Sequence, residues 1–102
     1  MEKYFNKLVR DNIPDIIIKN GGTPYTRILS DEEFKIELIK KLNEEYHEVV
    51  DSSGNDRIEE LADMLEIIKY LAMEEGSCLE EVIEVSKTKS LKRGAFDKII
   101  YL

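Results

Sequence analysis

Five acidic side chains recur at helical spacing in the middle of the chain: Glu44, Glu45, Glu48, Glu60 and Asp63. They form two clusters on either side of a short polar break, and apolar residues follow each cluster at intervals of three or four. Clustered carboxylates repel one another and raise one another's pKa unless a cation lies between them. Oxygen ligands without accompanying histidine or cysteine favour Mg²⁺ or Mn²⁺ over zinc. The pattern is compatible with a divalent-metal site and also with a solvated acidic surface.

The apolar residues around the acids favour the site. At about 100° per residue, Glu45 and Glu48 fall along the edge of an apolar stripe, whereas Glu44 lies on the opposite side of its helix. Glu60 and Asp63 share a side of the next helix with a stripe formed by Met64, Ile67 and Leu71. Burying a carboxylate without a partner is costly. We therefore expect the acids to converge on a cation if the two helices pack antiparallel.

Helix start signals divide the chain into elements. Pro14 suits the first turn of a short helix that Gly21 or Gly22 would close. Possible capping boxes open three longer helices: Ser30 with Glu33, Asp56 with Glu59, and Ser77 with Glu80. The connection "DSSGN" between the first two long helices is short enough to require an antiparallel hairpin.

These elements predict a mainly α fold in a single domain, residues 1–102, built as an antiparallel helical bundle. Residues 25–29 and 96–102 have strand-like composition and could form a small β pairing. The second long helix has two apolar stripes, so it should be covered on two sides. We expect one stripe to face the core and the stripe of Met64, Ile67 and Leu71 to face a partner subunit. The core-facing residues would be Ile58, Leu61, Leu65, Ile68 and Ala72.

Composition limits the functional class. The 102 residues include 22 acidic and 15 basic side chains, a formal net charge of −7, which argues against nucleic-acid binding. No stretch approaches the roughly 20 apolar residues of a membrane span, and the N-terminus does not resemble a signal peptide. We therefore expect a cytoplasmic protein with no membrane association. So small a domain buries little surface, which favours a homodimer or homotetramer.

The spacing Glu44-Glu45-x-x-Glu48 followed by Glu60-x-x-Asp63 resembles the EExxE and ExxD signature of the MazG-like, all-alpha nucleoside triphosphate pyrophosphohydrolases. The segments "YFNKLVRDNIPDII" and "KRGAF..IIYL" resemble the two ends of a house-cleaning subgroup of that superfamily. The resemblance thus extends from about residue 4 to the C-terminus. It implies the helical bundle of that family and cleavage between the α and β phosphates, giving a nucleoside monophosphate and pyrophosphate.

The resemblance also implies residue roles. Glu45, Glu48, Glu60 and Asp63 would coordinate Mg²⁺, with Mn²⁺ as a substitute, and Glu44 and Glu45 would be catalytic. Glu44 would contact a second metal or position the water. Basic residues must complete the charge at the phosphates, and the candidates are Lys7, Arg10, Lys89, Lys92 and Arg93.

Two alternatives stay open. One is an inactive helical dimerisation or binding module, whose acids contact a basic partner. The other is phosphoribosyl-ATP pyrophosphohydrolase, a related family with similar carboxylates. For the preferred function, the substrates would be non-standard nucleoside triphosphates, which the protein would clear. The base is not predicted, because base selectivity depends on pocket shape.

Overall fold

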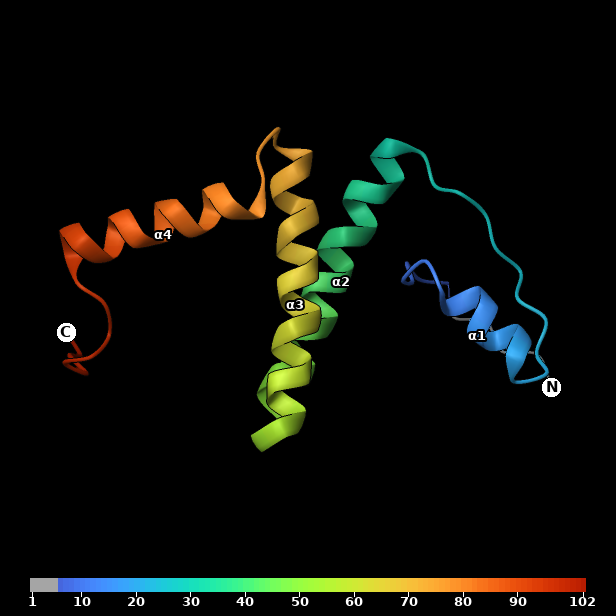
Figure 1. The fold of residues 1–102 in the computed structure, drawn as a ribbon, viewed down its shortest axis with the longest axis horizontal. Coiled ribbons are helices and arrows are strands. Elements are labelled where there is room, and N and C mark those ends of the chain that lie inside the picture. Colours follow the sequence, from blue (N-terminus) through green and yellow to red (C-terminus); the bar gives the residue numbers. More distant parts are fainter. Residues whose placement is uncertain (1–5) are drawn as a thin grey trace. The chain divides into compact units, whose positions relative to one another are not determined.

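The computed structural model describes residues 6–102, and four α-helices make up the regular structure of this part of the chain (Figure 1). They are α1 (Ile13–Lys19), α2 (Asp31–Asp51), α3 (Gly54–Glu74) and α4 (Leu79–Arg93). None of these helices is both long and apolar enough to cross a lipid bilayer. The predicted mainly α class is confirmed. The chain forms two compact units, one ending at Ile67 and the other Ile68–Leu102.

Helix α1 begins and ends as the sequence predicts. Pro14 lies in its first turn, where the missing N–H is not needed. At the other end, the backbone N–H groups of Gly21 and Gly22 donate to the carbonyls of Ile18 and Ile17, at 3.0 and 2.9 Å. Gly21 has a φ of 85°, a conformation that glycine adopts without steric cost. The glycine pair therefore terminates this helix.

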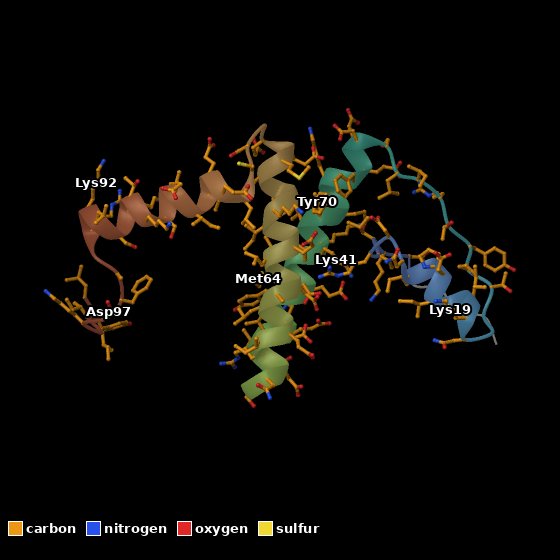
Figure 2. All side chains as sticks on the ribbon, in the orientation of Figure 1. Lys19, Lys41, Met64, Tyr70, Lys92 and Asp97 are labelled. Atoms are coloured by element: carbon orange, nitrogen blue, oxygen red, sulfur yellow. The ribbon has the colours of Figure 1, made fainter. Side chains whose placement is uncertain are left out.

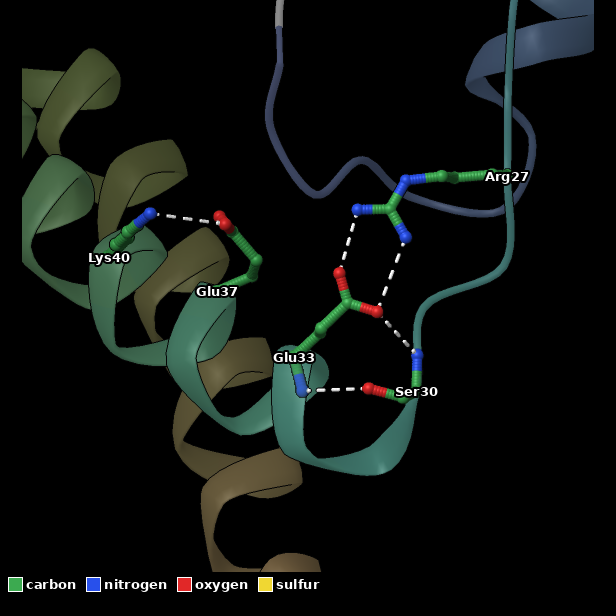
Figure 3. Close-up of polar contacts among 5 residues, drawn as sticks. All are labelled: Arg27, Ser30, Glu33, Glu37 and Lys40. Carbon is green, nitrogen blue, oxygen red and sulfur yellow. Dashed lines mark hydrogen bonds and ion pairs between the residues drawn. The ribbon is translucent and has the colours of Figure 1, made fainter.

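Hydrogen bonds among Arg27, Ser30 and Glu33 fix the start of α2 (Figure 3). The Glu33 N–H donates to Ser30 Oγ and the Ser30 N–H donates to Glu33 Oε1, both at 3.2 Å, which confirms the predicted capping box. Arg27 adds a two-pronged contact to the same carboxylate, at 3.3 and 2.7 Å. The hydrogen bond from Arg27, followed by those from Ser30, lowers the pKa of Glu33 to about 2. Three residues thus stabilise one helix end.

Helices α2 and α3 form the predicted antiparallel hairpin through a two-residue connection, residues 52–53 (Figure 1). Arg57 satisfies the last carbonyls of α2: its Nε donates to Val49 O at 3.0 Å and an Nη donates to Val50 O at 3.3 Å. The α3 helix begins at Gly54, where φ is 60°. The capping box expected at Asp56 is therefore wrong, because Asp56 already lies in the first turn.

The contact between α2 and α3 buries different apolar residues from those expected. Leu38 on α2 and Ile67 on α3 are only 3% and 7% exposed. By contrast, Ile58, Leu61 and Leu65 are 64%, 43% and 48% exposed, although the sequence pattern assigned them to the core. The stripe that contains Ile67 thus packs inward, and the first three residues of the expected core stripe face outward. Farther along α3, Ala72 is 8% exposed, which confirms its expected burial.

In the second unit, a glycine also ends α3. The Ser77 N–H donates to Ala72 O at 2.9 Å and the Gly76 N–H donates to Met73 O at 3.0 Å. This is a Schellman motif with Gly76 at a φ of 76°. The capping box expected at Ser77 is wrong. Its hydroxyl donates to Glu81 at 2.6 Å instead, and Cys78 is the N-cap of α4 without a side-chain hydrogen bond.

The predicted β pairing of residues 25–29 and 96–102 is also wrong, since no strand occurs within residues 6–102. Ile28 and Phe96 are 97% and 96% exposed, so neither segment gains burial that would support a strand. Ile99 has a φ of 55° and donates its N–H to Phe96 O at 3.1 Å, which makes the tail a turn.

Candidate metal centre

Three of the predicted ligands converge between the helices of the hairpin. One carboxylate oxygen from each of Glu45, Glu60 and Asp63 lies within 4.8 Å of the other two. Glu45 comes from α2 and the other two from the first half of α3, which the hairpin folds back alongside it. Glu45 is only 6% exposed, and Glu60 and Asp63 are half-buried. The group therefore lies partly within the packed hairpin.

The apolar contact itself places these carboxyl groups. Glu45 lies seven residues after Leu38, and Glu60 lies seven residues before Ile67, so each acid is two turns along the stripe of a buried residue. The packing that buries Leu38 and Ile67 carries Glu45 and Glu60 towards each other. Most of the free energy that holds the acids together thus comes from apolar burial, because like charges at this separation repel.

The fourth predicted ligand, Glu48, is exposed and adjoins Glu45 and Glu60, but it is not one of the three convergent residues. Burial first, and then the adjoining Glu48 and Glu60 carboxyl groups, raise the pKa of Glu45 to about 7. A hydrogen bond to Glu48 and burial raise the pKa of Glu60 above its usual range. Glu45 and Glu60 are therefore harder to ionise than isolated carboxyl groups, as expected for acids drawn together by the fold.

Two oxygens of this group lack a partner. Within the described residues, Glu45 Oε2 and Glu60 Oε2 are buried and accept no hydrogen bond. Buried acceptors are satisfied in most proteins, so each unsatisfied one needs an explanation. An oxygen-only donor set of this kind suits Mg²⁺ or Mn²⁺. The residues present therefore fit the metal that the sequence predicted.

Cationic side chains flank the carboxylates. An Arg10 Nη lies 2.8 Å from Asp63 Oδ1, and Lys7 Nζ lies 3.3 Å from Glu44 Oε1. Arg10 thus contacts one of the three convergent carboxylates, and Lys7 contacts the separate Glu44. Lys41, which the sequence analysis did not select, lies 3.7 Å from Glu44 Oε2. The i,i+3 spacing of Lys41 and Glu44 could have indicated this pair.

Glu44 is placed apart from the other acids. Its two carboxylate oxygens pair with Lys7 and Lys41, and it is not among the three convergent ligands. This position agrees with the outward angle expected for Glu44 on the helix. Its predicted role with a second metal or the water stays a prediction.

The remaining predicted phosphate ligands belong to the other unit. Lys89, Lys92 and Arg93 line a shallow hollow along α4 together with Glu81, Glu84, Val85 and Thr88. Figure 2 labels Lys92 on this helix. The three basic residues thus lie on one helix of the second unit. The carboxylates belong to the first unit. The first two residues of the quoted N-terminal segment, 4 and 5, lie outside the described residues.

Comparisons with known proteins give a partial match. An uncharacterized protein of Mycolicibacterium smegmatis is 49% identical to this chain over 43 residues. The match covers 42% of this chain and 44% of that protein, so it spans less than half the length of this relative. No family model matches the chain, and no solved structure matches it.

Proposed function

We propose that the protein is a Mg²⁺-dependent nucleoside triphosphate pyrophosphohydrolase that cleaves between the α and β phosphates. The main support is the convergence of Glu45, Glu60 and Asp63, together with two buried oxygens that accept no hydrogen bond from residues 6–102. An acidic group of this kind could bind a triphosphate only through a cation, because the charges of both are negative. The chemistry and the net charge of −7 are thus compatible.

The proposed ligands are Glu45, Glu48, Glu60 and Asp63. When bound, the divalent ion would neutralise phosphate charge and make a water molecule more acidic. The pKa of Glu45 is raised to about 7 without a metal, so binding of the divalent ion near neutral pH would displace a proton from this ligand. Lys7 and Arg10 lie at the edge of the acids and can contact phosphate oxygens. The same role for Lys89, Lys92 and Arg93 follows from the resemblance.

The test is pyrophosphate release from ordinary and damaged nucleoside triphosphates in the presence of Mg²⁺. Glu60→Gln should abolish release, because it removes a ligand charge while keeping the shape of the side chain. Glu59→Gln is the matched control, since the neighbouring Glu59 is exposed and outside the group. Equal activity of both variants, or no release from any substrate, would contradict the proposal.

Two further measurements, an assay with phosphoribosyl-ATP and a melting titration with Mg²⁺, separate the alternatives. Hydrolysis restricted to phosphoribosyl-ATP would identify the related family instead. An inactive binding module should show no Mg²⁺-dependent rise in melting temperature, whereas a site that binds metal only when folded must show one. The base preferred by an active enzyme would come from the substrate panel.

Self-association is proposed through the apolar side of the hairpin. The exposed stripe of α3 and a similar stripe of α2 are rotated in the same sense from the buried stripes, by roughly 100–130° at 100° per residue. In an antiparallel pair this places both stripes on one side, and Glu48 and Asp63 turn towards the opposite side. The apolar side comprises Ile36, Ile39, Tyr46, Val50, Ile58, Leu61 and Leu65, each more than 40% exposed. A second copy packed there would leave the acidic side open.

A further inference from the structure

Arg10 forms an ion pair with Asp63, one of the three convergent carboxylates. Its guanidinium donates a 2.8 Å hydrogen bond to Asp63 Oδ1, although the two residues are 53 positions apart. Three residues earlier, Lys7 pairs with Glu44 at 3.3 Å. The segment before α1 is thus held by two cations to the helices that carry the acids, and Arg10 contacts the proposed ligand Asp63.

The Arg10 contact is weak enough to exchange. The side chains of Arg10 and Asp63 are 58% and 43% exposed, and exposed ion pairs of this kind contribute about 0.2–1 kcal/mol. A divalent ion bound by Asp63 would also place positive charge beside the guanidinium, and like charges repel. Both effects favour loss of the Arg10 contact when the metal binds.

We infer that Arg10 is an internal counter-ion that a divalent metal displaces from Asp63. The exchange rests on the metal site of the proposed function, but it does not require hydrolysis. Lys7 would keep the segment near the helices, because Glu44 lies outside the three convergent ligands. The released guanidinium then stays close to the metal, where an anionic ligand can bind it. Metal binding would therefore control when this arginine is available.

The exchange would also reach α1. The Arg10 carbonyl accepts a hydrogen bond of 3.1 Å from the Ile13 N–H, the first residue of the helix. Arg10 and the start of α1 are thus joined through one hydrogen-bonded turn. A change of position at Arg10 should therefore displace the backbone at Ile13 more than at Lys19, at the far end of the helix.

The test compares Mg²⁺ affinity of the full chain and three variants by calorimetry. Arg10→Gln should lower the Kd for Mg²⁺ by a factor of about 1.4 to 5, which corresponds to the free energy of an exposed ion pair. Arg10→Lys, which keeps the charge, should stay closer to the wild type. Lys7→Gln is the matched control: it removes the same charge nearby but from Glu44, so its effect should be clearly smaller.

A second readout follows the arginine itself. The Arg10 side-chain N–H signal in NMR, assigned by its absence in Arg10→Lys, should shift with the same midpoint as the calorimetric Mg²⁺ titration. An unchanged or raised Kd in Arg10→Gln, or an Arg10 signal that ignores Mg²⁺, would show that Arg10 holds Asp63 in place and would overturn the inference. Equal effects of Arg10→Gln and Lys7→Gln would also overturn it, since general charge would then suffice.

These outcomes separate the inference from the proposed function. Tighter Mg²⁺ binding in Arg10→Gln without pyrophosphate release by the wild type would support the exchange and contradict the hydrolase. Hydrolysis with no response of Arg10 would do the opposite. Absence of any Mg²⁺ binding would overturn both.

Discussion

Replacing Glu45 by glutamine should stabilise the metal-free protein at alkaline pH. Glu45 is 6% exposed, and its Oε2 is buried without a hydrogen-bond partner in the part of the chain that the structure describes. Ionising this group in the folded chain is therefore unfavourable, and burial is the first cause of its raised pKa. The amide of glutamine has a similar shape and no charge, so the variant removes that cost.

The pH dependence follows from the direction of the shift. The pKa of Glu45 rises from 4.5 to about 7 on folding, so between these values the folded chain binds more protons than the unfolded chain. Stability from this group is complete below pH 4.5 and is lost as pH rises through about 7. A shift of this size corresponds to at most about 3 kcal/mol. Solvent around the exposed Glu48 screens part of it, which leaves roughly 1–2 kcal/mol.

The assay is urea unfolding with a chelator at pH 5 and at pH 8. Glu45→Gln should exceed the wild type in free energy of unfolding by roughly 1–2 kcal/mol at pH 8 and match it more closely at pH 5. Glu59→Gln serves as the control, because Glu59 is exposed and should show no such difference between the two pH values. If Glu45→Gln were destabilising at pH 8, the carboxylate would have a stabilising partner in the folded chain, and the reasoning would be refuted.

Three other outcomes are expected. Ser30→Ala should cost about 1 kcal/mol of unfolding free energy in urea titrations, because it removes the hydroxyl that caps α2; no loss would mean that Arg27 alone holds this end. Excess Mg²⁺ should raise the melting temperature of the wild type but much less that of Glu60→Gln, and equal shifts would exclude Glu60 as a ligand. Leu61→Glu should reduce the molar mass measured by light scattering to that of a monomer, and an unchanged mass would place the interface elsewhere.

Helix starts could be predicted only where no other interaction competed with the capping hydrogen bonds. At Ser30 the capping box forms, and Arg27 reinforces it from the preceding loop. At Asp56 the same pattern fails because the hairpin turns through two residues and Gly54 starts the helix earlier, at a φ of 60°. Ser77 uses its hydroxyl for Glu81 instead. A capping pattern thus reports a possible hydrogen bond, and the chain connection decides whether it forms.

Periodicity predicted two apolar stripes on α3 but not their order. Each stripe is long enough to bury a helix face, and the choice depends on which one meets the α2 stripe around Leu38 across a short hairpin. In the first unit the buried stripe is that of Ile67, which is 7% exposed. Ile58 of the other stripe is 64% exposed. The β-branched and aromatic residues of the tail were misleading for a related reason: strand propensity requires a neighbouring surface to pack against, as the 96% exposure of Phe96 shows.

The acids were the most predictable part of the site, because their positions follow from the same stripes as the core. Glu45 and Glu60 lie two turns from Leu38 and Ile67, so any packing that buries these two apolar residues also brings the carboxyl groups together. The cations were harder to place, since the separation of 53 positions between Arg10 and Asp63 leaves no periodic signal of their contact. The packing of the hairpin therefore holds its acids together against their repulsion. In the segment before α1, the positive charge of Arg10 offsets that repulsion at Asp63. Weakening the hairpin core, for example by Leu38→Ala, should consequently separate Glu45 from Glu60 and lower the pKa of Glu45.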